Sequence, residues 1–271
     1  MAIGYSVSKQ HALTALEPLR FSADGRFKIL HISDIHKVHP DMDDDPDRTV
    51  PEAKSLNTLN TLSEAIKRTQ PDLVVFGGDN IGGHWDEMTD EYVLWCIDSN
   101  DYAHGPDGAQ ITHDENRVFD SQLQWYEATV NAEKEKFGRT VPAVLFQHIP
   151  VVQVFDFIEE CDESICDYQH KGKFYRAKDG AIKSGQLREK PCPSYGSRAE
   201  FETWKRCGDI KAAFFGHDHI NSFCFEKDGI ELYQTIGCGY ETYGREHGGR
   251  LITLFKDGSY ETETVVIEKK Y

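Results

Sequence analysis

Four short apolar runs in this chain each lead into an aspartate or a histidine, and this repeated arrangement constrains the fold more than any other feature. Runs rich in Val, Ile, Leu and Phe are typical of strands that are buried on both faces of a sheet. In open α/β sheets, the side chains that bind ligands gather beyond the carboxyl ends of such strands. We therefore expect the four run ends to meet at one site. The runs are residues 27–33, 73–76, 143–147 and 212–215.

The residues that follow these runs are of metal-ligand type. The first run and the last run are each followed by two such residues, spaced two apart. In extended backbone, residues two apart project to the same side, so each pair can reach into one pocket. The second and third runs are each followed by a single candidate. The six candidates are Asp34 and His36, Asp79, His148, and His217 and His219.

The composition excludes several classes of protein. A formal charge of −16 and a pI near 5.1 argue against nucleic acid as a bulk partner, because such proteins bind phosphate through a basic surface. No run reaches the roughly 18 apolar residues of a membrane span, and residues 1–20 lack the apolar block of a signal peptide. We therefore expect a cytoplasmic protein with no membrane partner. The seven cysteines include no CxxC pair, which favours reduced thiols, with a Cys161–Cys166 disulfide as the alternative.

Hydrophobic spacing and punctuating residues predict the regular elements. Apolar residues at helical spacing predict two helices, the first capped by Ser55 and the second closed by Gly138, and a short third helix is expected before the last run. Turns with Asp-Gly between strand-like runs predict three hairpins. The expected helices are 55–69, 120–137 and 200–206, a further strand is 92–97, and the hairpins span 19–33, 223–233 and 251–267.

Residues 156–200 carry mixed charge, three cysteines and turn-forming residues, and they fit no regular pattern. We interpret them as a variable excursion near the mouth of the site, where substrate choice often resides. The acidic loop 41–47 is most simply solvated surface, with calcium binding as the lesser alternative. Because no internal repeat or low-complexity linker interrupts the chain, we expect one domain over residues 1–271.

Taken in order, these motifs resemble those of the calcineurin-like metallophosphoesterases, whose sequence pattern is DxH, GD, GNH, H and GHxH. The matching positions span roughly residues 27–240. The resemblance implies a mixed α/β (α+β) fold in which two mixed β-sheets pack face to face and helices flank them, as a four-layer sandwich. It also implies a binuclear metal centre. One ion would be held by Asp34, His36, Asp79 and His219, and the other by Asp79, His148 and His217.

Carboxylate and imidazole ligands together suit Mn, Fe, Zn or Ni better than Mg or Ca. Two such divalent or trivalent transition-metal ions, about 4 Å apart, can clamp a phosphoryl group and generate hydroxide near neutral pH. The resemblance therefore implies hydrolysis of a phosphomonoester or phosphodiester, on a small molecule or a protein, with metal-bound hydroxide as nucleophile. Asp79, which would bridge the ions, and His217 are the expected catalytic residues.

The chain departs from the family pattern at the GNH motif, whose asparagine completes the second metal site and whose histidine commonly acts as general acid. None of the seven asparagines is followed by histidine, and the stretch between Gly82 and Trp95 is too short for the usual helix and strand. General acid catalysis contributes roughly 10²–10⁴-fold, so we expect a weakened hydrolase. Candidate substitutes for the motif are Asn80, His84, Asn100 and His104.

Two further hypotheses remain. The chain could be a metal-binding protein of phosphoesterase fold that has little or no turnover and serves as a binding or scaffold module. Alternatively, the histidines could be structural, and no metal would bind. His31 is expected to pack in or pair near its strand, and His247 and Arg245 are lesser candidates for touching substrate. Purple acid phosphatases, in the same superfamily, carry a tyrosine three residues after the GD aspartate, where this chain has Gly82. An iron-tyrosinate colour is therefore not expected.

Overall fold

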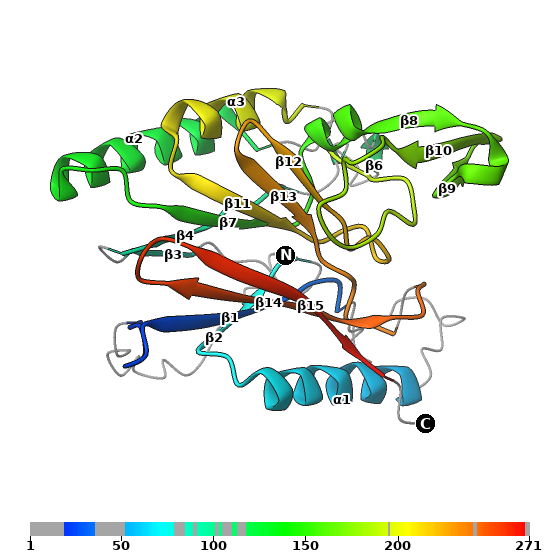
Figure 1. Cartoon of the computed structure of the whole chain (residues 1–271), viewed down its shortest axis with the longest axis horizontal. Coiled ribbons are helices and arrows are strands. Elements are labelled where there is room, and N and C mark those ends of the chain that lie inside the picture. Colours follow the sequence, from blue (N-terminus) through cyan, green and yellow to red (C-terminus); the bar gives the residue numbers. More distant parts are fainter. Residues whose placement is uncertain are drawn as a thin grey trace, which may run out of the picture.

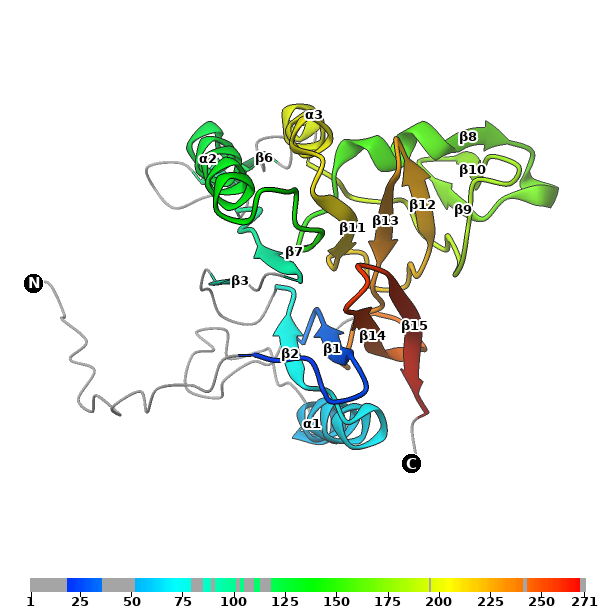
Figure 2. The same ribbon diagram turned by 60° about the vertical axis from the view of Figure 1, so that its left-hand side comes forward.

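The computed structural model of the chain shows two β-sheets that face each other, with helices on both outer faces (Figures 1 and 2). It describes residues 19–35, 52–78, 85–88, 91–100, 103–104, 110–112, 118–194, 196–240 and 243–268. The predicted acidic loop at 41–47 lies outside these residues. The layer order of helix, sheet, sheet and helix confirms the predicted four-layer sandwich.

A four-stranded sheet carries the first predicted run and has the strand order β15-β14-β1-β2. The first two strands along the chain pair in parallel, as expected for a strand–helix–strand crossover, and the remaining pairs are antiparallel. Helix α1 (Glu52–Thr69) covers the outer face of this sheet. The strands are β1 (Arg26–Ile32), β2 (Leu73–Phe76), β14 (His247–Phe255) and β15 (Tyr260–Ile267).

A six-stranded sheet has the order β12-β13-β11-β7-β4-β3. Its four central strands are parallel, and the two edge strands are antiparallel to their neighbours. Helices α2 (Asp120–Phe137) and α3 (Arg198–Cys207) cover its outer face. The strands are β3 (Trp85–Met88), β4 (Val93–Cys96), β7 (Ala143–Gln147), β11 (Ile210–Phe215), β12 (Cys224–Lys227) and β13 (Ile230–Gln234).

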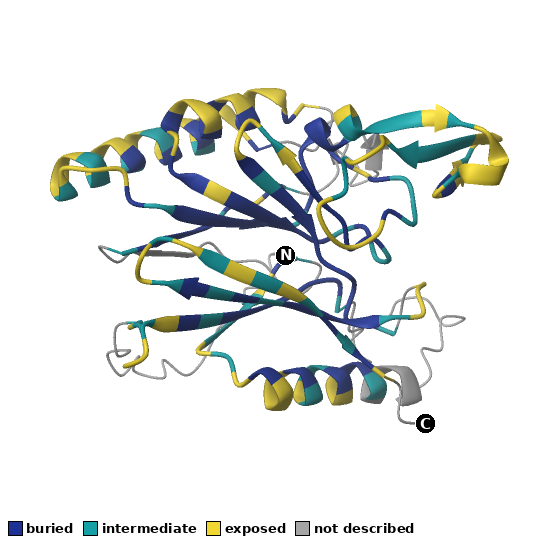
Figure 3. Ribbon diagram, viewed as in Figure 1, coloured by how far each residue is buried: buried dark blue, intermediate teal, exposed yellow. Residues whose placement is uncertain are grey.

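Apolar side chains from both sheets fill the space between them, and many residues of the facing strands are buried (Figure 3). Ile29 of β1 and Ile252 of β14 pack in the same cluster as Phe146 of β7 and Phe214 of β11. Burial of apolar side chains of this size stabilises a fold by roughly 1.5–3 kcal/mol each. The two sheets are therefore held as one unit, which fixes the positions of their strand ends.

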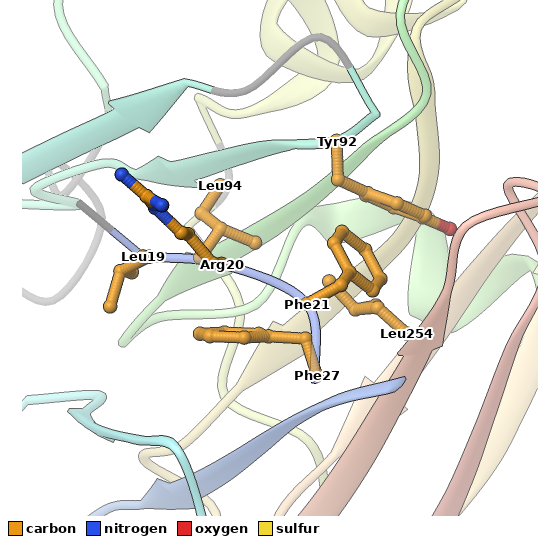
Figure 4. Close-up of a pocket in the computed structure, with 7 residues that line it drawn as sticks. All are labelled: Leu19, Arg20, Phe21, Phe27, Tyr92, Leu94 and Leu254. Carbon is orange, nitrogen blue, oxygen red and sulfur yellow. The ribbon is translucent and has the colours of Figure 1, made fainter. Parts of the chain in front are cut away.

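The structure corrects the prediction of a hairpin over residues 19–33. The turn exists, with Gly25 in the left-handed region at φ 77°, but the residues before it form no strand. Leu19 and Phe21 instead lie against Phe27 and Leu94 at the end of the inter-sheet core (Figure 4). The gap between these side chains has a volume of only about 20 Å³. It lies at the beginning of β1, away from the predicted ligands, and it is too small for a substrate.

The excursion also holds regular structure that the sequence did not predict. Residues 158–177 form a three-stranded antiparallel sheet of order β8-β10-β9, which projects beside the main body (Figure 1). Its strands are β8 (Ile158–Cys161), β9 (Tyr168–His170) and β10 (Lys173–Ala177). Two 3₁₀ turns, Val152–Phe157 and Glu163–Ile165, accompany them, and β5 (Ala103–His104) pairs with β6 (Gln110–Thr112) elsewhere.

The sequence predicted that Ser55 caps the first helix. Helix α1 instead begins at Glu52, so Ser55 lies inside it and is not its cap. None of the described helices combines the length and apolarity needed to cross a bilayer. The seven cysteines, all within the described part of the chain, are free thiols, so the alternative Cys161–Cys166 disulfide is not formed.

Candidate metal centre

The ends of the predicted strands lie at one edge of the sandwich and are joined by backbone hydrogen bonds. The Gly216 amide donates to the His148 carbonyl at 3.0 Å, which connects the ends of β11 and β7. The Asp34 amide donates to the Gly78 carbonyl at 3.3 Å, which connects the ends of β1 and β2. The Gly239 amide reaches the Asp34 carbonyl at 2.9 Å. The amide of His217, after β11, also donates to Oδ2 of Asp34, after β1, so segments from both sheets meet at this edge.

The Asp34 carboxylate is fully buried and lies at the centre of the candidate site. Its Oδ1 is 3.4 Å from Nε2 of His219 and 3.9 Å from Nε2 of His148. Its Oδ2 accepts a hydrogen bond from the His217 amide at 3.1 Å. Two ligands of one ion, each about 2.1 Å from it, lie roughly 3–4 Å apart. The spacing of Asp34 and His219 fits such a pair.

The second pair of predicted ligands lies beside the first. The rings of His148 and His217 are 5.0 Å apart and nearly perpendicular, at 74°. The structure thus brings together four of the six predicted ligands. The other two, His36 and Asp79, lie outside the described residues. Within the described ranges alone, no three His, Cys, Asp or Glu side chains form a metal-binding group.

Gly78, the residue before Asp79, lies against the His148 ring. Its φ is +126°, and a Cβ at this position would be 2.4 Å from Cγ of His148. No side chain can occupy that space, so glycine is required for the end of β2 to lie beside the end of β7. Gly78 therefore brings the chain to the candidate ligands immediately before Asp79.

Two of the predicted ligands have strained backbone. Asp34 and His217 have φ values of 54° and 73°, in the left-handed region that residues with a side chain rarely adopt. Such residues cost about 1–3 kcal/mol each and concentrate at functional sites. Gly216, before His217, permits the close approach, because a Cβ there would be 1.7 Å from the Ser33 hydroxyl oxygen.

A carboxylate from the excursion supports the loop of residues 216–221, which carries the GHxH motif and is called the GHxH loop below. Oε1 of Glu189 accepts the Ile220 amide at 2.8 Å, and Oε2 accepts the Tyr243 hydroxyl at 2.6 Å. The Tyr243 ring lies 4.5 Å from the ring of His219. Sequence reasoning did not identify Glu189 or Tyr243, because no local motif marks either residue and their contacts exist only in the folded chain.

The loop is also tied to residues 188–192 through Asp218 and Asn221. The Asp218 carboxylate accepts the Cys192 amide and the Asn221 side-chain amide, both at 3.0 Å. Burial raises the pKa of Asp218 to about 8. Asn221 in turn accepts the Arg188 amide at 2.8 Å. Asp218 thus holds the 188–192 segment against the loop that carries the two histidines.

Two other histidines have structural roles. His31 is fully buried, and its Nδ1 lies 2.9 Å from the Thr235 hydroxyl. Burial lowers the pKa of His31 to about 3, so the ring is neutral, which confirms the expectation that it packs within the strand. His247 is buried and stacks on Tyr240 at 3.8 Å. That position makes His247 a packing residue.

The described residues offer little substitute for the missing GNH motif. Asn100 has a φ of 60°, and its side-chain amide donates to Gln122 at 3.2 Å, near the start of α2. It therefore supports a helix end. Asn80 and the side chains of His84 and His104 lie outside the described residues.

Comparison with known proteins gives a match over most of the chain. A sequence model described as calcineurin-like phosphoesterase matches residues 27–221. The chain is 25% identical to "probable inactive purple acid phosphatase 14" of Arabidopsis thaliana, over 87% of this chain and 76% of that protein. It is 23% identical to "probable inactive purple acid phosphatase 28" of the same plant, over 86% and 75% of the two chains.

The first of these alignments extends over 325 residues, more than the 271 residues of the whole chain, so the plant protein has segments that this chain lacks. Among solved structures, a dimetal phosphatase from Danio rerio aligns with a TM-score of 0.48 and 12% identity. That alignment covers 84% of this chain and 93% of the fish protein.

Proposed function

The chain belongs to the calcineurin-like phosphoesterase family, and from that premise we propose that it hydrolyses phosphomonoesters or phosphodiesters at a binuclear transition-metal centre. The observation that carries the proposal is that the buried Asp34 carboxylate lies beside two imidazoles, one after β7 and one after β11. Asp34 lies within 4 Å of His148 and His219, with contacts of 3.9 and 3.4 Å. This donor set suits Mn, Fe, Zn or Ni.

The proposed ligand assignment follows the family pattern. Asp34, His36, Asp79 and His219 would hold one ion, while Asp79, His148 and His217 would hold the other. When bound, such ions supply Lewis acidity toward a phosphoryl oxygen and lower the pKa of water. The catalytic residues in this proposal are Asp79, shared between the ions, and His217.

The protein's own contribution is to orient the ligands before any ion arrives. The His217 amide fixes one oxygen of Asp34 by a hydrogen bond of 3.1 Å, which directs the other oxygen toward His148 and His219. Because Asp34 is fully buried, bulk water does not compete for its oxygens. Hydrogen bonds around a ligand fix its orientation and raise its affinity for metal.

A second candidate function is metal binding with weak or absent turnover, in a binding or scaffold role. Three observations favour it. The chain contains no Asn-His dipeptide, so the usual general acid is missing. The curated relatives bear the word "inactive" in their names. Their alignments are longer than the chain, which agrees with the loss of an internal unit.

An assay with added Mn²⁺ separates the two functions. We expect the wild type to hydrolyse p-nitrophenyl phosphate or bis-p-nitrophenyl phosphate slowly, and we expect Asp79→Asn to lower that rate at least 100-fold, because Asp79 would contact both ions. Metal content is measured by mass spectrometry on the same samples. If both proteins are equally inert while the wild type retains metal, the hydrolase proposal fails and the binding function stands.

A further inference from the structure

A pocket with a volume of about 240 Å³ lies between the three-stranded sheet and Lys190. Its apolar lining comes from Phe155, Ile158, Tyr168 and Tyr175. Pockets that enclose a whole small ligand usually measure about 300–1,000 Å³. This pocket is therefore of the size that holds one ring system of a larger molecule.

The walls of the pocket are aromatic and flat. Tyr168 of β9 and Tyr175 of β10 are cross-strand partners, and their rings stack at 5.3 Å with planes 16° apart. The ammonium group of Lys190 lies 5.8 Å from the centre of the Phe155 ring. Aromatic walls favour a planar ligand, because offset-stacked rings gain attraction beyond the area they bury.

Among the described residues that line the pocket, Lys190 is the one lysine or arginine. The carboxylate of Glu159 is 2.7 Å from Arg176, and that of Glu160 is 2.7 Å from Lys173, so both acids at the rim are neutralised by β10. Lys190 forms no ion pair with any residue that the structure describes. In a chain with a formal charge of −16, an unneutralised lysine among aromatic rings is suited to attract an anion.

His170, which also lines the pocket, adds no positive charge. Burial, followed by the nearby charges of Lys190 and Lys171, lowers the pKa of His170 from 6.5. The imidazole is therefore mainly neutral at pH 7, where it can donate or accept a hydrogen bond. The charge preference of the pocket depends on Lys190.

The 188–192 segment contacts both the pocket and the loop that carries His217 and His219. Glu189 contacts the GHxH loop and Tyr243, while the next residue, Lys190, contacts the pocket. Tyr168 lies close enough to Asp218, between the two loop histidines, for that carboxylate to help raise its pKa. The loop that carries the two histidines and the pocket are therefore joined by one short segment of chain.

We propose that this pocket is a substrate subsite, and that it accepts the leaving group of the phosphate ester in the form of a planar aromatic or heteroaromatic ring that bears a negative charge. Tyr168, Tyr175 and Phe155 enclose the ring, and Lys190 binds its anionic substituent. The inference rests on the proposed hydrolase function and adds a substrate class to it.

Binding of 2-naphthoate, a planar aromatic anion, tests the ligand class without any turnover. By isothermal titration, the wild type should bind 2-naphthoate more tightly than neutral 2-naphthalenemethanol or aliphatic hexanoate. Lys190→Met should weaken naphthoate binding about tenfold, the effect of losing one charge-assisted hydrogen bond, and Lys190→Arg should retain it. Lys67→Met removes an exposed lysine from the last turn of α1, which covers the other sheet, and serves as the matched control.

Competition tests whether the pocket serves the reaction. In the wild type, 2-naphthoate should inhibit p-nitrophenyl phosphate hydrolysis competitively, and Lys190→Met should need about ten times more of it. Naphthoate binding that is unchanged in Lys190→Met, or that leaves hydrolysis uninhibited, would overturn the subsite. If no ester is hydrolysed but naphthoate binding still depends on Lys190, the proposed function fails while the assigned ligand class stands.

Discussion

At the residue scale, Glu189 supports the candidate ligand His219, and the sequence alone did not identify it. Its carboxylate holds both the amide of Ile220, next to His219, and the hydroxyl of the Tyr243 ring that lies against His219. These contacts restrict the rotation of the His219 imidazole. Groups that orient a metal ligand in this way typically contribute about 10–100-fold to metal affinity.

We expect Glu189→Gln to weaken Mn²⁺ binding about tenfold, because the amide offers only one acceptor oxygen where two are used. Tyr243→Phe should have a smaller effect, since it removes the hydroxyl and keeps the ring. Chelator competition gives the dissociation constants. Glu160→Gln, which breaks an exposed ion pair with Lys173, is the control and should leave the constant unchanged. Equal constants for Glu189→Gln and the control would exclude the positioning role.

At the element scale, helix α3 carries an acidic group into the interior beside β7. Glu200 is only 2% exposed, and burial raises its pKa to about 8, although a hydrogen bond from Gln147 acts in the opposite direction. The folded protein therefore holds a proton on Glu200 that the unfolded chain releases near pH 4.5. The free energy of unfolding must fall as the pH rises between these two values.

Glu200→Gln removes this proton linkage. We expect the variant to be more stable than the wild type at pH 8, by up to a few kcal/mol, and the difference should shrink as the pH falls toward 5.5. Urea unfolding across pH 5.5–9 measures it. Glu202→Gln alters an exposed acid on the same helix and should follow the wild-type profile. If the free energies of unfolding of Glu200→Gln and wild type vary in parallel with pH, Glu200 is already ionised in the folded protein over this range, and the prediction is wrong.

The elements that the sequence predicted correctly have strong local signals. Helix α2 ends where Gly138 adopts the left-handed conformation, and apolar spacing marks its buried face. The strands of the three-stranded sheet were missed because they are short and are stabilised by pairing with one another. Glu159 of β8, for example, meets Arg176 of β10, seventeen residues further along the chain. Local spacing carries no information about such a pair.

At the scale of the whole molecule, the order of the motifs predicted both the sandwich and the edge at which its strand ends meet. Asp34, His148, His217 and His219 lie close together, although Asp34 precedes His148 by more than 100 residues of chain. The supporting residues could not be predicted in this way. Glu189 reaches Ile220 and Tyr243 only after the excursion has packed against the GHxH loop, and no local pattern specifies that packing.

The central claim is that these side chains bind transition-metal ions together, and an anomalous difference map from crystals grown with Mn²⁺ tests it most directly. We predict a peak bonded to both Oδ1 of Asp34 and Nε2 of His219, and a second peak about 4 Å away, at His148 and His217, each with metal–ligand bonds of about 2.0–2.2 Å. A map without density at Asp34, from protein in which these four side chains keep their positions, would contradict the account.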